Sequence, residues 1–132
     1  MKRFLLILFV LTIISTGCVN VNTKNNDPEE AAYKKISAED AKKIIESEDV
    51  IVLDVRTPEE YNEGHIENAV LLPVNDIKDK AGEALTDKDA KILVYCRSGN
   101  RSATAAKELI EMGYTDVYDF GGIMSWPYEI VK

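Results

Sequence analysis

The sequence is poor in cysteine and histidine, the residues that build disulfides and many transition-metal centres. Its 132 residues include cysteine only at Cys18 and Cys96, and histidine only at His65. If Cys18 is modified, Cys96 has no partner and an intramolecular disulfide cannot form. A lone thiol indicates a reactive group, and the ordinary alternative is a small buried hydrophobic residue. Nothing in the sequence suggests a metal or an organic cofactor, and we expect neither.

Basic residues are too few to indicate a nucleic-acid-binding protein. The chain has 16 Lys and Arg against 23 Asp and Glu, which gives a formal net charge of -7. Nucleic-acid binding depends on concentrated Lys and Arg, so we expect no nucleic-acid partner. The remaining composition, 45% hydrophobic and 30% charged, is typical of an ordinary globular domain.

The chain has one long apolar run, at residues 4–14 near the N-terminus, and no comparable run after it. This run is shorter than the roughly 20 residues that a membrane-spanning helix needs, and it follows two basic residues, as in a signal peptide. Gly17 and Cys18 then resemble the lipobox of bacterial lipoproteins, although Ser15 stands where the commonest form has Leu. That resemblance implies a lipidated Cys18 at the mature N-terminus and a protein held outside the cytoplasm on the bacterial cell membrane. The alternative is an anchor that stays uncleaved.

The segment after Cys18 is rich in Asn, Thr, Lys, Asp and Glu and has no apolar periodicity. Such a composition is typical of a flexible tether. We therefore predict three parts: a signal peptide at residues 1–17, a lipid-anchored tether at 18–33 and one folded domain at 34–132.

Within the domain, short apolar runs alternate with segments of helical pattern. Ser37 is a good helix N-cap, and Thr57 and Glu60 form a capping box before a helix that should end at Gly64. Further helices are expected at 76–85 and 102–112, and strands at 50–53, 69–72, 91–95 and 116–120. This alternation predicts an α/β domain with a mainly parallel sheet, in which ligands bind at the carboxyl ends of strands.

Cys96 follows the clearest strand and opens a short loop before a helix. The segment reads Cys96-Arg97-Ser98-Gly99-Asn100-Arg101-Ser102. Backbone amides in such a loop form a concave anion site, and the positive end of the following helix points at it. With two arginines beside it, the thiol is expected to have a lowered pKa and to act as a thiolate nucleophile.

Three groups of residues in this order resemble the rhodanese-like family. In that family a cysteine opens a six-residue active loop that ends in Arg or a similar residue, as Cys96 to Arg101 do here. The second group is the motif before the loop, which here consists of Asp54-Val55-Arg56, Glu60-Tyr61 and Gly64-His65-Ile66. The third is the C-terminal motif, Gly121-Gly122-Ile123-Met124-Ser125-Trp126. The resemblance implies a single domain with a five-stranded, mainly parallel sheet flanked by helices.

The resemblance also implies a reaction, the transfer of sulfane sulfur. Cys96 would take sulfur from thiosulfate or a persulfide, hold it as a persulfide, and give it to cyanide or a thiol. The partners implied are a small anionic sulfur donor and an acceptor that can be a thiol-bearing protein. Residues 97–102 would bind the substrate, with Arg97 and Arg101 attracting the anionic donor.

Three other functions remain open. Cysteine phosphatases share the loop architecture, but their loop is one residue longer than the one that ends at Arg101. A thiol redox role is possible, although no second cysteine lies near Cys96. A binding module without catalysis is the third alternative, and the presence of Cys96 and both arginines argues against it.

Four residues outside the loop have a structural and a functional interpretation. Asp54 could hold a loop arginine or cap the following turn, and Arg56 could support the loop or form an ordinary ion pair. For His65 a structural role is favoured over that of a catalytic base. Trp126 is expected to pack in the core.

Overall fold

The structure is a computed structural model that describes residues 33–132. The predictions made for the signal peptide, for Cys18 and for the tether up to residue 32 lie outside these residues. Within residues 33–132, no helix has both the length and the apolar character needed to cross a membrane.

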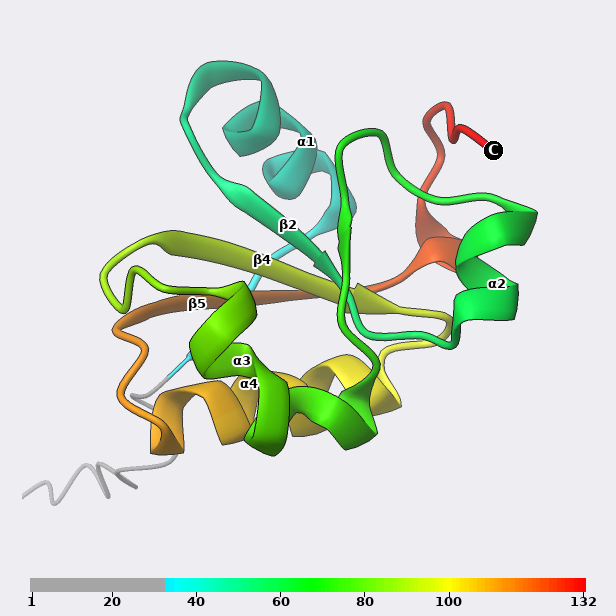
Figure 1. The fold of residues 1–132 in the computed structure, drawn as a ribbon. Coiled ribbons are helices and arrows are strands. Elements are labelled where there is room, and N and C mark those ends of the chain that lie inside the picture. Colours follow the sequence, from blue (N-terminus) through cyan, green and yellow to red (C-terminus); the bar gives the residue numbers. More distant parts are fainter. Residues whose placement is uncertain (1–32) are drawn as a thin grey trace, which may run out of the picture.

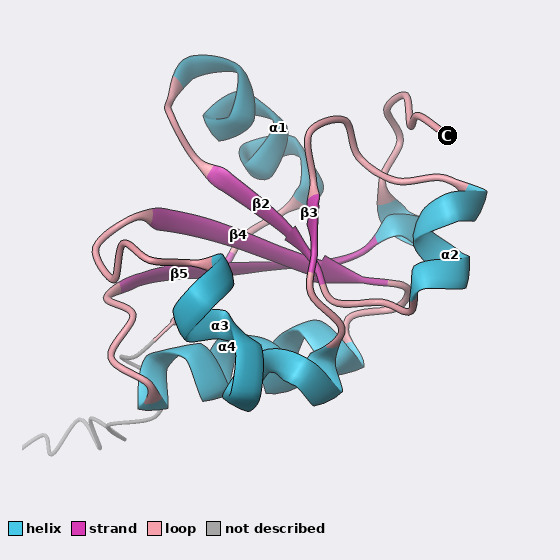
Figure 2. Cartoon of the chain, viewed as in Figure 1, coloured by secondary structure: helices cyan, strands magenta, loops and turns pink. Residues whose placement is uncertain are grey.

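Five parallel strands form one sheet in the order β1-β5-β4-β2-β3 (Figure 2). Their bounds are β1 Lys34–Lys35, β2 Ile51–Asp54, β3 Val70–Leu71, β4 Lys91–Cys96 and β5 Asp116–Gly122. The predicted α/β class and the five-stranded parallel sheet are confirmed. Because β4 is a central strand, the residue that ends it lies at the middle of the carboxyl edge of the sheet.

Helices cover both faces of the sheet (Figure 1). The helical segments are α1 Ala38–Ser47, α2 Pro58–Glu63, α3 Ile77–Ala84 and α4 Asn100–Glu111, with short 3-10 turns η1 Val74–Asp76 and η2 Ile123–Ser125. Helix α1 lies on one face and α3 and α4 lie on the other, while α2 sits beyond the carboxyl ends of the strands.

Alternation along β4 divides the core into two halves. Ile92, Val94 and Cys96 join the cluster under α3 and α4. Leu93 and Tyr95 point to the other face, where α1 packs. Successive side chains of a strand point to opposite faces, and here both faces are buried, which explains the continuous apolar run that marks this strand in the sequence.

Three elements differ from the sequence prediction by more than one residue: strand β1, the start of helix α4, and the end of β5, which runs to Gly122 instead of residue 120. Strand β1 was not predicted, because two exposed lysines carry no apolar pattern; its strand character comes from pairing with Tyr118 and Asp119 of β5. Helix α4 begins at Asn100, two residues before the predicted start. The earlier start brings the first turn of α4 into the loop that follows Cys96.

The C-terminal tail returns to the turn after α2. Val131 forms an isolated antiparallel bridge with His65, whose imidazole stacks on the ring of Tyr61 with centroids 3.7 Å apart. His65 Nδ1 also lies 2.9 Å from the carbonyl oxygen of Tyr61. These contacts agree with the structural interpretation of His65. Trp126 is buried, as predicted, and packs against Phe120.

Candidate active site

Cys96 is the last residue of β4 and has almost no exposed surface. Only three residues separate it from the first residue of α4. Gly99 makes this tight connection possible, since its φ of 109° is in the left-handed region that favours glycine. The strand and the helix therefore hold the sulfur between them.

The sulfur of Cys96 accepts hydrogen bonds from the backbone at the start of α4. The amide of Gly99 donates to Sγ at 3.0 Å. Helix α4 has no side-chain cap, whereas α1 is capped by Ser37 and α2 by Thr57. The first amides of α4 are therefore left for the sulfur, or for whatever the sulfur binds.

These contacts lower the pKa of the Cys96 thiol. Burial alone raises it, but hydrogen bonds from the Ser102 hydroxyl and from the amides of Ser102, Gly99 and Ser98 outweigh that effect. Hydrogen bonding to the charged form is one of the physical routes to a lower pKa. Of the influences that the sequence predicted, the loop amides are thus among the main causes of the lowered pKa, whereas no arginine is among them.

Ser102 is buried in the first turn of α4, directly behind the loop. Its hydroxyl donates to the carbonyl of Gly99 at 3.0 Å and lies 3.3 Å from the carbonyl of Gly121. A hydroxyl has one proton, so a bond to an ionised sulfur would replace these two. Ser102 therefore links the sulfur, the loop and the end of β5.

Two glycines at the end of β5 allow the loop to lie close to the sheet. A Cβ on Gly122 would overlap the carbonyl oxygen of Arg97. Gly121 has a φ of 88°, and the amide of Met124 donates to the Arg97 carbonyl at 3.2 Å. The paired glycines after β5 are thus explained by backbone contact with the active loop.

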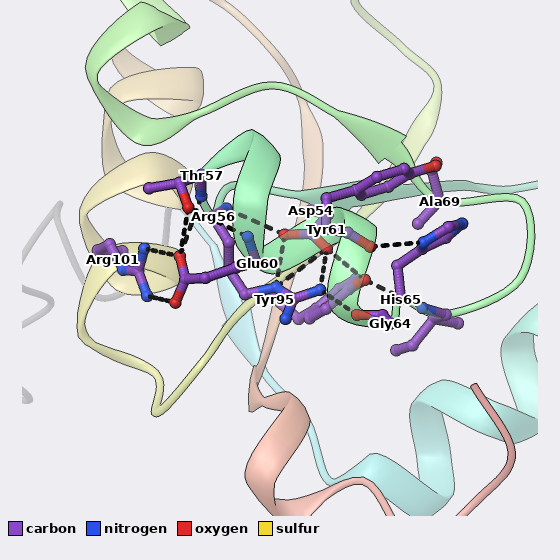
Figure 3. Close-up of polar contacts among 11 residues, drawn as sticks. Asp54, Arg56, Thr57, Glu60, Tyr61, Gly64, His65, Ala69, Tyr95 and Arg101 are labelled. Carbon is purple, nitrogen blue, oxygen red and sulfur yellow. Dashed lines mark hydrogen bonds and ion pairs between the residues drawn. The ribbon is translucent and has the colours of Figure 1, made fainter. Parts of the chain in front are cut away.

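Arg101 does not point freely into the site, because Glu60 of α2 holds it (Figure 3). The two terminal nitrogens of its guanidinium donate to the two carboxylate oxygens of Glu60 at 2.7 and 2.9 Å. Glu60 is itself fixed by the capping box with Thr57, in which each residue bonds the backbone amide of the other. The Arg101 hydrogen bonds lower the pKa of Glu60 to about 2.

Arg97, Ser98 and Asn100 are exposed. Within residues 33–132, the guanidinium of Arg97 forms no hydrogen bond and no ion pair. Its positive charge is therefore available to a ligand. Ser98 and Asn100, but not Arg97, line an open hollow of about 330 Å³ together with Lys35 and Asp119.

Asp54 and Arg56 form a buried ion pair below the carboxyl end of β4. Arg56 donates to Asp54 through Nε at 3.0 and 3.1 Å and through Nη2 at 2.7 Å. The Arg56 amide also donates to Asp54 at 3.0 Å, so Asp54 caps its own turn. Of the two interpretations from the sequence, capping the turn fits, and pairing of Asp54 with a loop arginine is wrong.

Tyr95 completes this buried network. Its hydroxyl donates to Asp54 Oδ2 at 2.6 Å and accepts from the amide of Ile66 at 3.1 Å. Arg56 Nη2 reaches the carbonyl of Gly64 at 2.8 Å. The network ties the residue before Cys96 to the turn that follows α2 (Figure 3).

Sequence reasoning missed two residues at the site. Glu60 was recognised as part of a capping box and of the family motif but not as a site residue, and no local signal indicates its partner Arg101, which lies 41 residues away. Tyr95 was assigned to a strand without a role for its hydroxyl. In the described part of the chain, no group of His, Cys, Asp and Glu could hold a metal ion.

Comparison with known proteins identifies the family. Residues 37–128 match the Rhodanese-like domain. The chain belongs to this family.

Named relatives agree with that assignment. The rhodanese-like chain is 39% identical over 71 residues to thiosulfate sulfurtransferase PspE of Escherichia coli (strain K12), covering 54% of this chain and 68% of the relative. It is 36% identical over 95 residues to thiosulfate sulfurtransferase GlpE of Coxiella burnetii, covering 71% of this chain and 87% of the relative. These relatives support sulfurtransferase activity at the level of the family.

A solved structure supports the fold of the rhodanese-like domain. A rhodanese-related protein from Thermoplasma volcanium superposes with a TM-score of 0.66 at 36% sequence identity. The match covers 75% of this chain and 98% of that protein.

Proposed function

We propose that the domain transfers sulfane sulfur through a persulfide on Cys96. The observation that carries the proposal is the hydrogen bonding of a buried sulfur by the first amides of a helix that has no side-chain cap. The same amides can stabilise a thiolate before the reaction and a persulfide anion after it.

The reaction has two steps. The Cys96 thiolate attacks the sulfane sulfur of thiosulfate, a bond forms between the two sulfurs, and sulfite leaves with the electron pair of the broken bond. An acceptor thiolate or cyanide then attacks the outer sulfur of the Cys96 persulfide and releases the Cys96 thiolate. A persulfide donor follows the same course, with a thiolate as the leaving group. Neither step needs an oxidant or reductant.

One observation disfavours a phosphatase. Phosphoester hydrolysis through a cysteine requires a general acid to protonate the leaving group. Glu60 is the carboxylate paired with the loop arginine, and its pKa of about 2 leaves it without a proton at neutral pH. Asp54 is buried in its pair with Arg56, so it is not available for that role either.

We also propose the location that the N-terminal sequence suggests. A lipid on Cys18 would hold the domain outside the cytoplasm, at the bacterial cell membrane, through the segment up to residue 33. Donors and acceptors would then be small sulfur compounds or thiol-bearing proteins of that compartment. The support for this proposal is the residue pattern around Gly17 and Cys18.

The test is the intact mass of the full chain, purified in detergent, after incubation with thiosulfate and removal of the excess. We expect a gain equal to one sulfur atom that is lost on adding cyanide. Cys96→Ser should gain nothing, and Cys18→Ser, which removes the other cysteine, should gain the sulfur as the wild type does. A folded wild-type chain that gains no sulfur would contradict the proposal.

A further inference from the structure

Two of the three arginines in residues 33–132 are paired with carboxylates. Arg101 uses both terminal nitrogens on Glu60, and Arg56 is bound by Asp54 through its Nε and Nη2. Both pairs are visible in Figure 3. Arg97 alone remains without a carboxylate partner among the residues that the structure describes.

Arg101 is close enough to the sulfur to interact with it electrostatically. Its pKa is raised, first by the hydrogen bonds to Glu60 and, after other contributions, by the negative charge on Cys96. Glu60 is therefore placed to cancel a positive charge that a bound anion would otherwise meet. The side chains of Arg101 and Glu60 are 34% and 25% exposed, so solvent screens their charges only in part.

We propose that Glu60 sets the donor preference of the site, by neutralising Arg101 so that donors with one negative charge are favoured over the thiosulfate dianion. The favoured class is that of monoanionic sulfane donors, namely persulfides of uncharged thiols and organic thiosulfonates. Glu60 is a positioning residue, because it acts on the donor only through Arg101. This inference rests on the proposed sulfurtransferase function.

The physical reason is a count of charges. The loop amides, with the exposed guanidinium of Arg97 on the same loop, can meet one negative charge of either donor, so they serve both donor classes alike. The second charge of thiosulfate would gain from a further cation, and the guanidinium of Arg101, which closes the loop, is already paired with Glu60. Since Glu60 is ionised throughout the neutral pH range, its effect on donor preference does not change with pH there.

Two donors of nearly equal shape isolate this effect. Methanethiosulfonate has a methyl group where thiosulfate has a charged oxygen, and both deliver sulfur from a sulfonyl centre. With methanethiosulfonate, the Cys96 thiolate takes the outer sulfur and methanesulfinate leaves with the electron pair. The ratio of kcat/KM for the two donors, measured on the full chain with cyanide as acceptor, cancels any change in the fraction of thiolate.

Glu60→Gln is the decisive variant. Glutamine still serves in a capping box, so α2 is retained, and its one carbonyl oxygen can keep one of the two hydrogen bonds from Arg101 while the negative charge is removed. We expect kcat/KM for thiosulfate to rise about fivefold relative to methanethiosulfonate, mainly through a lower KM, as Coulomb attraction of one extra charge predicts. Glu59→Gln is the matched control, since Glu59 is exposed in the same turn and forms no ion pair among the described residues. It should leave the ratio unchanged.

The double variant Glu60→Gln/Arg101→Gln removes both charges and should restore the wild-type ratio. The proposal is overturned if Glu60→Gln leaves the ratio of kcat/KM unchanged. An equal fall in kcat/KM for both donors, as a purely structural role would give, is one such result. The proposal is also overturned if Glu59→Gln raises the ratio as much as Glu60→Gln does. Failure of the proposed function looks different, because the wild type would then accept sulfur from neither donor.

Discussion

Tyr95→Phe removes one buried hydroxyl from the network below the active loop. That hydroxyl donates to the Asp54 carboxylate and accepts from the Ile66 amide, and Tyr95 has no exposed surface. A hydrogen bond to a charged group contributes about 1.5–3 kcal/mol, and a buried amide left without a partner costs about 1–3 kcal/mol. Since such contributions are not additive, we expect a loss of about 3 kcal/mol in the free energy of unfolding.

Urea unfolding measures this loss, with an unchanged m-value as the sign that the two-state transition is kept. A domain of this size should also lose more than about 10 °C in Tm. Tyr61→Phe is the matched control, because it removes one hydroxyl that donates at 2.8 Å to the neutral Ala69 carbonyl. It should cost only about 1 kcal/mol.

The reasoning is refuted if Tyr95→Phe costs no more than Tyr61→Phe. A second readout separates the network from the chemistry. The Tyr95 hydroxyl contacts neither the sulfur nor the loop, so the folded variant should still take up one sulfur from saturating donor. Loss of that uptake in a folded variant would assign Tyr95 a direct part in the reaction.

Three more predictions concern the site itself. Ser102→Ala should raise the pKa of Cys96, because it removes a hydrogen bond to the thiolate; the pH dependence of iodoacetamide alkylation measures it, and an unmoved midpoint would contradict it. The folded pKa of Glu60, about 2, lies below its ordinary value of 4.5, so its pairing with Arg101 stabilises the fold above pH 4.5 and this stabilisation fades as pH falls toward 2. Glu60→Gln should therefore cost up to about 1 kcal/mol at pH 7 and much less at pH 2 in urea unfolding, whereas an equal cost at both would refute the assignment. Gly122→Ala should cost about 1–3 kcal/mol through overlap with the loop carbonyl, and thermal unfolding at the wild-type Tm would contradict this.

The sequence predicts those features that depend on neighbouring residues. The apolar run of β4 and the Thr57 capping box are local patterns, and both elements form where expected. The position of Cys96 at a strand end follows from the same run. A lowered pKa for its thiol was predicted as well, from the loop amides, the helix end and the two arginines together, and the amides and the Ser102 hydroxyl are the contributors that lower it.

Features that depend on distant residues could not be predicted in this way. β1 is a strand only because β5 offers a free edge, and its two lysines carry no strand signal. The partner of Arg101 could not be chosen among the many carboxylates of an acidic chain, because Glu60 is distant in sequence and already has a local role. Asp54 was expected either to hold a loop arginine or to cap the following turn, and only the folded geometry shows that its partner is Arg56.

The bond from the Gly99 amide to the Cys96 sulfur has a consequence for folding itself. The start of α4 stabilises the thiolate, so by thermodynamic linkage ionisation of the thiol must stabilise the folded chain. Because the folded pKa of Cys96 lies below its ordinary value, this contribution is complete above the unfolded pKa and is lost as pH falls through the folded one. The reactive thiol of this domain is therefore also a source of its stability. The Tm of the domain should depend on whether Cys96 is ionised.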